Sequence, residues 1–450
     1  MQKKLLRVLL INPWIYDFAA YSFWSSPLGL LYVGSILRQN HMEVRLVDCM
    51  QVVEGKRKAD GRAPFVKEKV VNPPALKRVR KRLKRYGISS DTFIRELSEI
   101  EKPDLILITS IMTYWYLGVK EALGVARGVF PSSKIVVGGI YPSLCFEHAG
   151  HTLQEADLIV KNSEIERFYG FIEQTFNRML TYKPSLYDLD HIPYPCYDLY
   201  GTIPFIPLLT SFGCMYRCTY CATPYMHPNI IRRKPESVLE EIKHWHELGV
   251  DRYVLYDDNF LYRSELYAKP LLEKLSKLPF PIDIYNPNAL NGALIDDELA
   301  LLLRSAHFRE IRIGLETTNP SLQQSTGGKV SLRSFERAVA ALLKAGFKKN
   351  EITAYILAGL PNQKWEEVKH SIDYVLNSGI QPYIAEYTPI PHTSLFDEFE
   401  HHARFPISED PVYQNNALFP FAWAGFTEKN LEHLKLYARG KKSCPEQLGQ

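Results

Sequence analysis

Residues Ser211–Tyr225 read SFGCMYRCTYCATPY and contain Cys214, Cys218 and Cys221, three of the seven cysteines in the chain. The spacing is C-x3-C-x2-C, with the aromatic Tyr220 directly before the last cysteine and no fourth cysteine nearby. Three thiolates on one short loop can bind three irons of a [4Fe–4S] cluster, because cluster irons take cysteine ligands. The fourth iron is then left for a ligand that is not protein.

Two other uses of these cysteines follow from the same residues. A structural zinc ion would need a fourth Cys or His ligand, and His227 lies close enough in sequence to supply it. A disulfide framework fits less well, because the three cysteines are an odd number and no signal peptide is recognisable. The sequence therefore favours an iron–sulfur cluster and leaves zinc as the alternative.

The composition is that of a globular enzyme. The chain has 450 residues, of which 46% are hydrophobic and 23% are charged, so it is long enough for two or three domains. Apolar runs such as Leu5–Ile11 and Leu105–Ile111 are too short to span a bilayer. The first of these runs ends at Asn12-Pro13 without a small-residue cleavage site, which predicts a buried strand. With few cysteines, the expected location is the reducing cytoplasm.

Residues 1–165 alternate between strand-like and helix-like patterns. Leu5–Ile11 is a nearly continuous apolar run, which is typical of a strand buried on both faces. Parallel strands joined by helices predict a Rossmann-like, doubly wound α/β sheet whose ligands bind at the carboxyl ends of its strands. These ends lie near Asn12, Asp48, Thr113–Tyr116 and Gly138–Tyr141. The predicted strands are 5–11, 43–48, 104–110 and 134–137, and the predicted helices are 28–39, 91–100 and 117–129.

Residues 201–395 show a more regular repeat, which follows a linker at 166–200. Apolar strands, each followed by a loop and most by a helix, predict a partial (β/α)6 version of the eight-fold TIM-type barrel. The three-cysteine loop follows the first strand, where parallel barrels place their chemistry. Residues 396–450 are predicted to be a C-terminal extension with one closing helix near Glu428–Ala438. The expected barrel strands are 205–210, 253–256, 282–285, 311–315, 352–357 and 384–388.

A basic insertion at residues 51–90 interrupts the N-terminal pattern. It contains thirteen Lys or Arg residues and three acids, a net charge of +10 in a chain whose total is +4. Such a segment is able to bind nucleic acid, an anionic lipid or a phosphorylated substrate. Its low apolar content and its lack of a stacking-aromatic pattern favour a solvated surface loop, so nucleic acid is not the preferred partner.

The cysteine loop resembles the signature of the radical S-adenosylmethionine (SAM) superfamily, and later strand ends resemble other motifs of that family. The resemblance implies a [4Fe–4S] cluster on Cys214, Cys218 and Cys221, whose open iron is chelated by the amino and carboxylate groups of SAM. It also implies SAM contacts beside the cluster and at four later strand ends. These residues are Tyr220 in the loop, Asp257 and Asp258 in YDDNF, Asn288 in NPNALNG, Glu316 in GLET, and Gly359 in YILAGLPNQ.

Some of these motifs have alternatives or departures. The Asp257–Asp258 pair would equally serve to cap the helix that follows it. Arg312 is expected to be structural, and Asn362 stands where the family usually has a second glycine. The sixth strand end, YTPIPHT (387–393), also resembles the family pattern.

The N-terminal region resembles the cobalamin-binding-like domain that precedes the barrel in a large subgroup of the family. The resemblance is carried by LLINPW, PLGLLYVGSILRQNHMEVRLVDC, TSIMTYWY and IVVGGIYPSLCFEHA. It implies cobalamin contacts at Thr113, Tyr114, Trp115, Gly138 and Gly139. The loop after the first strand contains no His to ligate cobalt, so cobalamin is bound without a protein ligand or the fold no longer binds it. Trp14, Trp24, Tyr114, Trp115 and Tyr116 would line a pocket or pack the seam between domains.

The remaining cysteines and the paired histidines do not indicate a further site. Isolated thiols are expected to be buried and structural, and the histidine pairs are expected to be solvated. A second cluster, as in methylthiotransferases, would use three N-terminal cysteines, and the spacing here is unlike that group. These residues are Cys49, Cys145, Cys196 and Cys444, and His244, His246, His401 and His402.

The resemblance implies a radical SAM enzyme. An external one-electron donor of the flavodoxin or ferredoxin type reduces the cluster, and SAM is cleaved to methionine and a 5′-deoxyadenosyl radical that abstracts hydrogen from an unactivated carbon. With cobalamin, the expected reaction is methylation of that carbon. The alternatives are rearrangement, oxidation or crosslinking without cobalamin and, from another class, a zinc-stabilised nucleic-acid-binding module.

Overall fold

The computed structural model describes residues 5–423 and 425–440, and the chain divides into two compact units. The first unit comprises residues up to Pro204 together with Ser408–Gln414, and the second comprises Phe205–Ile407 and the residues from Asn415 onward. Cys444 and the side chain of Trp24 lie outside the described parts. No described helix is both long enough and apolar enough to cross a bilayer.

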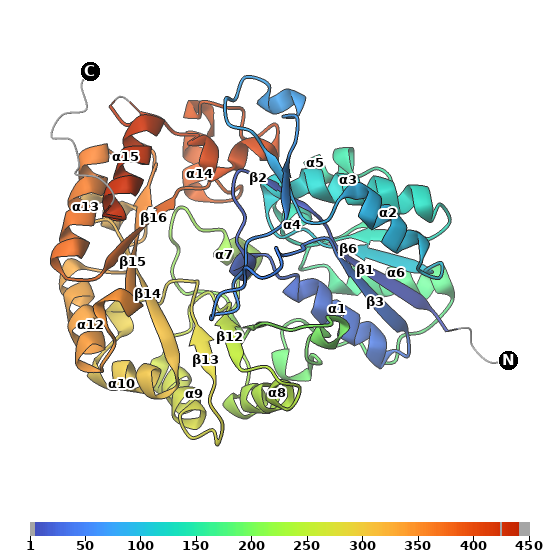
Figure 1. Ribbon diagram of the computed structural model, residues 1–450, viewed down its shortest axis with the longest axis horizontal. Helices are drawn as coiled ribbons and strands as arrows, with labels where there is room; N and C mark the ends of the chain where they lie inside the picture. Colours follow the sequence, from blue (N-terminus) through green and yellow to red (C-terminus); the bar gives the residue numbers. More distant parts are fainter. Residues whose placement is uncertain (1–4, 424, 441–450) are drawn as a thin grey trace. The chain divides into compact units, whose positions relative to one another are not determined.

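The first unit is built on a five-stranded parallel sheet with the order β3-β1-β6-β7-β8 (Figure 1). The central strands are buried on both faces because helices cover the sheet, which explains the continuous apolar runs. The strands are β1 (Arg7–Asn12), β3 (Glu43–Asp48), β6 (Leu105–Ile108), β7 (Lys134–Val137) and β8 (Leu158–Ile159). The helices are α1 (Leu28–Gln39), α2 (Ser90–Ser98), α3 (Tyr116–Val129), α4 (Ile140–Leu144), α5 (Phe146–Thr152) and α6 (Ile165–Phe176).

The basic insertion is folded, which differs from the solvated loop expected from its composition. It supplies β4 (Lys67–Lys69), η2 (Pro74–Leu76) and β5 (Lys84–Tyr86), and the two strands form an antiparallel sheet of order β2-β5-β4 with β2 (Ile15–Asp17). A few apolar residues spread through the insertion are sufficient to anchor it. Phe65 and Tyr86 pack in one buried cluster with Ile15, Tyr114 and Trp115, and Leu76 and Leu83 are also buried.

A short segment from the C-terminal part of the chain completes the first unit. Its 3-10 turn η10 (Pro411–Gln414) packs against η3 (Thr113–Trp115). Asp410 forms a hydrogen bond with Tyr116, and the Tyr413 hydroxyl donates to the Ala75 carbonyl at 2.6 Å. Other short 3-10 turns of this unit are η1 (Ser22–Trp24), η4 (Leu189–His191) and η5 (Tyr197–Leu199).

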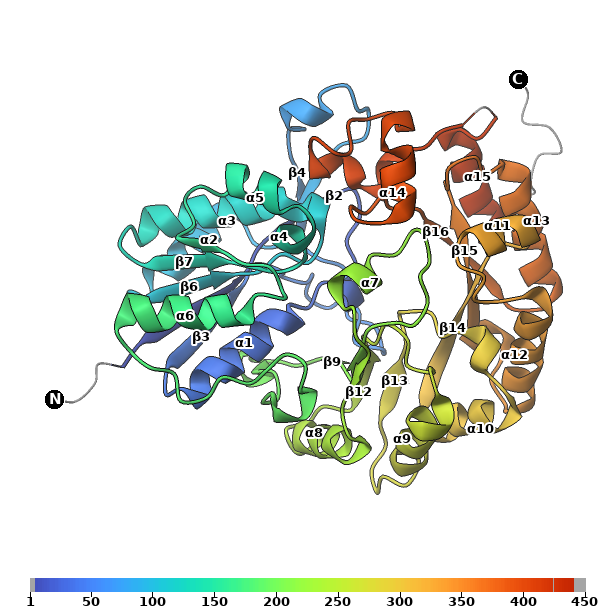
Figure 2. The ribbon, with the colours of Figure 1, turned by 180° about the vertical axis from the view of Figure 1, so that it is seen from behind.

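The second unit is a six-stranded parallel sheet with the order β16-β15-β14-β13-β12-β9, and β9 and β16 form its two edges. Its helices lie along the outer face of the curved sheet (Figures 1 and 2). The strands are β9 (Ile206–Leu208), β12 (Arg252–Leu255), β13 (Asp283–Tyr285), β14 (Phe308–Glu316), β15 (Ile352–Ala358) and β16 (Gln381–Glu386). A small hairpin of β10 (Ser211–Phe212) and β11 (Ile231–Arg232) follows β9.

The helices of the second unit follow the strand–loop–helix repeat. They are α7 (Thr223–Met226), α8 (Pro235–Glu247), α9 (Ala268–Leu275), α10 (Asp297–Ser305), α11 (Pro320–Ser325), α12 (Leu332–Lys344), α13 (Trp365–Asn377), α14 (Ser394–Phe399) and α15 (Glu428–Ala438). The 3-10 turns are η6 (Ser264–Leu266), η7 (Gly292–Leu294), η8 (Lys349–Glu351), η9 (Glu400–His402) and η11 (Asn416–Leu418).

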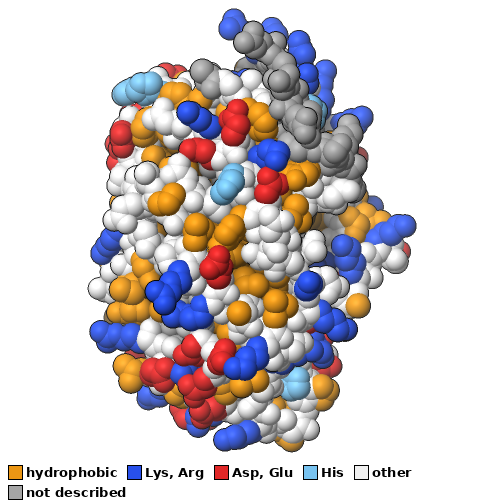
Figure 3. All heavy atoms as spheres, turned by 90° about the vertical axis from the view of Figure 1, so that its left-hand side faces the viewer, with side chains coloured by type: hydrophobic (Ala, Val, Ile, Leu, Met, Phe, Trp, Pro, Cys, Tyr) orange, Lys and Arg blue, Asp and Glu red, His pale blue; other side chains and the backbone are white. Residues whose placement is uncertain are grey.

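Helix α12 shows why these segments become helices. Ser331 and Ser334 form a reciprocal capping box at its start, which satisfies backbone donors that would otherwise lack partners. Phe335, Ala338 and Leu342 recur at helical spacing and are buried. On the face drawn in Figure 3, acidic and basic side chains intermix among single apolar ones, as expected for the outward side of such helices.

The predicted fold class is confirmed: an α/β protein with a Rossmann-like parallel sheet followed by a six-stranded partial barrel. The predicted strands match the observed ones to within a few residues. The two small antiparallel sheets and the two-residue strand β8 were not predicted, because such short strands carry too little periodicity to recognise.

Two glycines of helix α3 provide a test of the packing in the first unit. A Cβ added at Gly118 would lie 1.9 Å from the backbone oxygen of Trp14, whereas at Gly124 the nearest neighbour is a Glu155 side-chain oxygen at 3.9 Å. We expect Gly118→Ala to lower the free energy of unfolding by about 1–3 kcal/mol through overpacking. Gly124→Ala should raise it by roughly 0.5–1 kcal/mol. Urea unfolding measures both, and equal effects would contradict the packing described.

Candidate active site

The three-cysteine loop begins where β9 ends and runs through the β10–β11 hairpin. Gly213 adopts φ +87, and a Cβ at this position would lie 2.2 Å from the Asn229 carbonyl oxygen. Only glycine fits such a close backbone approach at positive φ. The backbone at Gly213, immediately before the first cysteine, therefore packs closely against the backbone at Asn229, near the other end of the loop.

The paired acids at the end of β12 hold this loop, and each binds a different part of it. Asp257 is buried, and its carboxylate accepts from the Thr210 backbone N–H at 2.7 Å and the Ser211 hydroxyl at 2.8 Å. Asp258 accepts from the Gly213 N–H at 2.8 Å and from the Thr223 hydroxyl at 3.3 Å. Both acids thus already accept hydrogen bonds, Asp257 from the end of the first barrel strand and Asp258 from the cysteine loop, and Asp257 is the more deeply buried of the two.

Cys218 is buried, and Cys214 and Cys221 are partly buried. Burial raises the pKa of the Cys214 and Cys218 thiols, and in Cys218 the nearby Lys329 opposes the rise. The Asn259 side-chain amide donates to the Cys214 sulfur at 3.4 Å. Since the neutral thiols are favoured here, deprotonation has to be coupled to metal binding.

The spacing of the thiols argues against a single metal ion. Thiolates on one tetrahedral zinc ion stand about 3.8 Å apart, given a Zn–S distance of about 2.3 Å. Among the described residues, the one group of three potential ligand atoms within 4.8 Å of one another is Glu265, Asp296 and Glu298, and Lys269 forms ion pairs with all three. The three cysteine sulfurs do not form such a group, so at least two of them stand more than 4.8 Å apart, and in a cluster each thiolate binds a different iron. His227 instead packs against the Phe212 ring at 4.6 Å.

Glu316 lies at the carboxyl end of β14 in an unusual backbone conformation. Its φ is +67, and the pairing of β14 with β15 shifts register between Gly314 and Glu316. Such bulges re-aim side chains next to active sites, and positive φ in a non-glycine residue stores strain. The Glu316 carboxylate forms an ion pair with the Lys329 ammonium at 2.5 Å.

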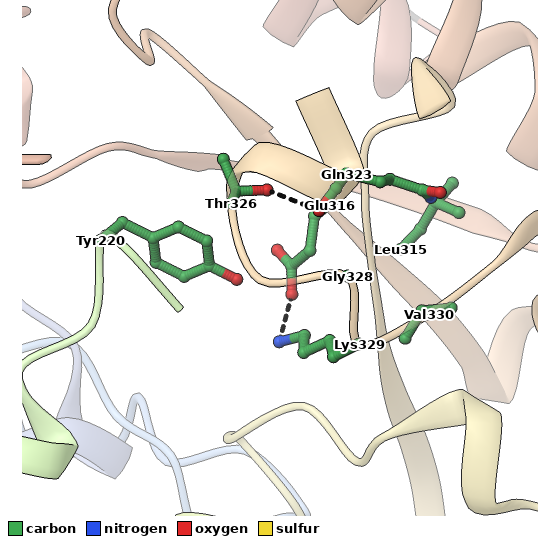
Figure 4. Close-up of a pocket in the computed structure, with 8 residues that line it drawn as sticks. All are labelled: Tyr220, Leu315, Glu316, Gln323, Thr326, Gly328, Lys329 and Val330. Carbon is green, nitrogen blue, oxygen red and sulfur yellow. Dashed lines mark hydrogen bonds and ion pairs between the residues drawn. The ribbon is translucent and has the colours of Figure 1, made fainter. Parts of the chain in front are cut away.

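The ion pair lies at the wall of a small hollow that opens to solvent (Figure 4). The Tyr220 ring points toward Glu316 across the hollow, and Lys329 lies beneath it (Figure 4). Burial alone would lower the pKa of Lys329, but the Glu316 carboxylate and the Cys218 sulfur outweigh burial and raise it. The hollow thus contains a permanent cation beside the cluster loop. It is lined by Tyr220, Leu315, Glu316, Gln323, Thr326, Gly328, Lys329 and Val330.

The segment that delivers Lys329 also contacts the cysteine loop directly. Gly327 adopts φ +128, and a Cβ there would lie 2.9 Å from the Cys218 sulfur. The Thr219 N–H donates to the Thr326 carbonyl at 3.4 Å. The sequence analysis missed Lys329, although the run STGGKV, a glycine pair followed by a cation soon after an acidic strand end, was a readable signal.

The turn after β15 is closed by its own side chains. Gly359 has φ +89, and a Cβ there would lie 2.7 Å from the Phe419 ring. Gln363 accepts from the Gly359 N–H at 2.9 Å and donates to the Leu357 carbonyl at 2.9 Å. Asn362 adopts φ +60, a conformation that asparagine tolerates better than most residues. Asn362 stands where the family usually has a second glycine, and it adopts a backbone conformation that glycine also favours.

Asn288 lies over the end of β12. Its side-chain amide donates to the Tyr256 and Asp257 carbonyls at 3.2 and 3.3 Å. The neighbouring Asn286 donates to the Arg312 carbonyl at 2.9 Å. Arg312 itself forms an ion pair with Glu310 and donates to the Tyr355 hydroxyl, which is consistent with a structural role.

In the first unit, the expected cobalamin contacts lie at the carboxyl edge of the sheet, and several of them are used in packing. Trp115 donates to the Asp17 carboxylate at 2.6 Å, and Tyr114 lies with it in the buried cluster described above. Thr113 is also buried. At Gly139 a Cβ would lie 2.2 Å from the Ser110 carbonyl oxygen, whereas Gly138 meets only Val160, at 3.4 Å or more.

A small hollow is present at the ends of β1 and β6. Its lining is mostly apolar, with small hydroxyl and amide groups, and the residues are Asn12, Pro13, Trp14, Ile15, Thr109, Ser110, Ile111, Trp115 and Val119. Trp14 is almost fully buried: its indole donates to the Ile88 carbonyl at 2.7 Å and its ring meets Phe93 edge-on. Tyr116 stacks on Tyr141.

The second unit thus combines a parallel partial barrel with three cysteines after its first strand and a hollow with an ion pair at its wall. Residues 208–375 match the model of the Radical SAM superfamily. The barrel therefore carries the radical SAM domain that its motifs predicted.

The similar curated proteins include methyltransferases. The bacteriochlorophyllide d C-12(1)-methyltransferase of Chlorobaculum tepidum is 26% identical over 318 residues, which cover 67% of each chain. The cytidylyl-2-hydroxyethylphosphonate methyltransferase of Streptomyces wedmorensis is 21% identical over 443 residues, covering 83% of this chain and 77% of the relative.

Solved structures share the fold of both units. The radical SAM methyltransferase TsrM from Kitasatospora setae, solved with cobalamin and a [4Fe–4S] cluster, superposes with a TM-score of 0.65 at 17% identity. The superposition covers 89% of this chain and 78% of TsrM. The cobalamin-dependent SAM radical enzyme OxsB gives a TM-score of 0.58 at 15% identity, over 92% of this chain and 58% of OxsB. At such identities the likeness establishes the fold.

The buried Asp257 predicts a specific pH dependence of stability. Burial raises the pKa of Asp257 to about 6, although hydrogen bonds from Thr210 and Ser211 oppose the rise. The native state therefore holds this proton more tightly than the unfolded chain, where the pKa is near 4. The resulting stabilisation is full below about pH 4 and is lost as pH rises through about 6.

Asp257→Asn removes this titration. The unfolding free energy of the wild type minus that of Asp257→Asn should fall by about 2 kcal/mol between about pH 4.5 and 7.5. Urea unfolding of the metal-free protein at several pH values measures this difference. A difference that stays constant across the range would contradict the burial of an ionisable Asp257 at the strand end.

Proposed function

We propose that this chain is a cobalamin-dependent radical SAM methyltransferase that methylates an unactivated carbon. The observation that carries the radical SAM part is the cysteine loop with the Glu316–Lys329 hollow beside it. The methyl-transfer part rests on the methyltransferases among its relatives and on a fold shared with TsrM and OxsB.

The residues of the loop fit an iron–sulfur cluster. Cys214, Cys218 and Cys221 would hold it, since they lie on one loop after the first barrel strand and all three are free of disulfides. Such a cluster supplies one-electron reduction of the SAM sulfonium, with the electron coming from an external donor of the flavodoxin or ferredoxin type. The protein holds the loop rigid through Asp258 and restricts water around it.

The hollow beside the loop fits the polar end of SAM. Lys329 would bind the SAM carboxylate, because its ammonium is permanently charged and lies next to Cys218. Glu316 and Asp258 offer carboxylates to the SAM ammonium, and such charge-assisted pairs are strong. Tyr220 would cover the hollow from the opposite side, while Asn288 and the backbone at Gly359 would contact the nucleoside.

The first unit would hold cobalamin at the carboxyl edge of its sheet. The hollow between Asn12, Ser110 and Trp115 provides an apolar floor with small polar groups, and Gly138 leaves open backbone beside it. Residues 12–26 contain no His, so cobalt would have no histidine ligand from the loop after β1. Bound cobalamin would supply the methyl group.

In the second unit, we assign Asp257 a structural role, in which it holds the start of the cysteine loop.

Anaerobic reconstitution tests the proposed function directly. We expect protein loaded with iron and sulfide to contain about four irons per chain and to retain hydroxocobalamin with its corrin absorption after gel filtration. Retained iron without retained cobalamin would favour radical rearrangement, oxidation or crosslinking and would overturn the methyltransferase proposal. Stoichiometric zinc without iron would overturn the radical SAM assignment as well.

Lys329→Met tests the assignment of the SAM carboxylate. Loss of a charge-assisted contact should weaken SAM binding to the cluster-loaded protein by about 10–100-fold. Equilibrium dialysis with labelled SAM measures this change, and iron content per chain should remain at the wild-type level.

The matched control is Lys344→Met, which removes an ion pair of the same 2.5 Å length with Asp297 on the exposed face of the barrel. It should bind SAM as the wild type does. If Lys329→Met also bound SAM within about twofold of the wild type, the hollow would not be the SAM site.

A further inference from the structure

The loop that joins β4 to β5, residues 70–83, is the most strongly charged surface segment of the first unit. This basic loop reads VVNPPALKRVRKRL, with five Lys or Arg residues and no acid. Lys77, Arg78, Arg80 and Arg82 are exposed, and none of the four forms an ion pair with a residue in the described part of the chain. The face in Figure 3, by contrast, mixes both signs.

The basic loop is held in one conformation by its own residues. The Asn72 side-chain amide donates to the carbonyls of Leu76, Val79 and Lys81 at 3.2, 3.2 and 2.9 Å. Its oxygen accepts from the Leu83 N–H at 3.0 Å. Leu76 and Leu83 are buried, so the loop is anchored at both sides of its cations.

The segment that returns from the C-terminal part of the chain supports the same loop. The Tyr413 hydroxyl donates to the Ala75 carbonyl at 2.6 Å, 338 residues away in sequence. The loop and η2 extend from β4 and β5 as the light-blue segment of Figures 1 and 2. Because the backbone is already ordered, binding a partner does not require the loop to lose further conformational freedom.

The loop also exposes apolar surface next to its cations. Val71 is 86% exposed, and Val66, just before β4, is 36% exposed. Residues 66–83 contain no aromatic side chain, whereas proteins that bind single-stranded nucleic acid stack bases on aromatic rings. Clustered cations beside an exposed aliphatic side chain instead match the surface of an anionic bilayer, which attracts each Lys or Arg and accepts apolar groups at its interface.

We propose that the basic loop binds the surface of membranes that contain anionic lipids and holds the enzyme there as a peripheral protein. Lys77, Arg78, Arg80 and Arg82 contact lipid phosphates, and Val71 inserts at the level of the headgroups. This proposal does not depend on the cofactors or on the reaction, because all of its residues belong to the insertion.

Vesicle co-sedimentation of the full chain tests the proposal. Vesicles of phosphatidylcholine with about 30% phosphatidylglycerol should bind the protein at least about tenfold more tightly than phosphatidylcholine alone, and about 0.5 M NaCl should abolish the difference. The triple variant Arg78→Glu, Arg80→Glu, Arg82→Glu should lose at least about tenfold. Val71→Ser should lose a few-fold, with the salt dependence retained.

The control variant carries the same charge change on the second unit: Lys243→Glu, Lys277→Glu, Lys349→Glu, all at exposed positions. It should bind vesicles nearly as the wild type does, and circular dichroism checks that both triple variants are folded. Equal loss in both variants, or no preference of the wild type for anionic vesicles, would overturn the proposal. So would binding of an RNA oligonucleotide that depends on the loop while vesicle binding does not.

Discussion

The carboxylates at the end of β12 are the interaction on which the candidate site depends. Asp257 fixes the end of β9 from within the core, and Asp258 fixes the Gly213 and Thr223 ends of the cysteine loop. Two neighbouring residues just after one strand thus fix both ends of the loop that carries the three thiols. A cluster needs thiolates at separated positions around it, and these hydrogen bonds position the loop that carries them. Because β12 pairs with β9 in the sheet, the two acids that follow β12 lie beside the start of the cysteine loop.

The second determinant of the site is strain at the end of β14. The register shift and the positive φ of Glu316 turn its carboxylate toward Lys329. Gly327 then allows this segment to approach Cys218 closely. The cysteine loop, the Glu316 carboxylate and the Lys329 ammonium therefore lie at the same end of the sheet. This is the end at which parallel strands carry their loops. This combination of a carboxylate and an ammonium is suited to a sulfonium ligand such as SAM, which carries an amino group and a carboxylate of its own.

The strand–helix repeat and the fold class were predictable from sequence, because apolar periodicity is a local property, and the cysteine spacing likewise allowed a cluster loop to be proposed. The different hydrogen-bond partners of Asp257 and Asp258 were not predictable, because nothing in the sequence distinguishes two adjacent aspartates. Lys329 was missed because its pairing with Glu316 depends on a turn after the strand. The basic insertion was expected to be a solvated loop, and its fold became visible only through packing of Phe65 and Tyr86 with residues far away in sequence.

The central claim is that the Cys214–Cys221 loop holds a [4Fe–4S] cluster with one iron open to SAM. Electron paramagnetic resonance of the anaerobically reconstituted, one-electron-reduced protein tests it most directly. The account predicts the signal of a reduced [4Fe–4S] cluster whose g-values shift when SAM is added, and no such signal in Cys218→Ala. A cluster signal that SAM leaves unchanged, or one that persists in Cys218→Ala, would contradict it.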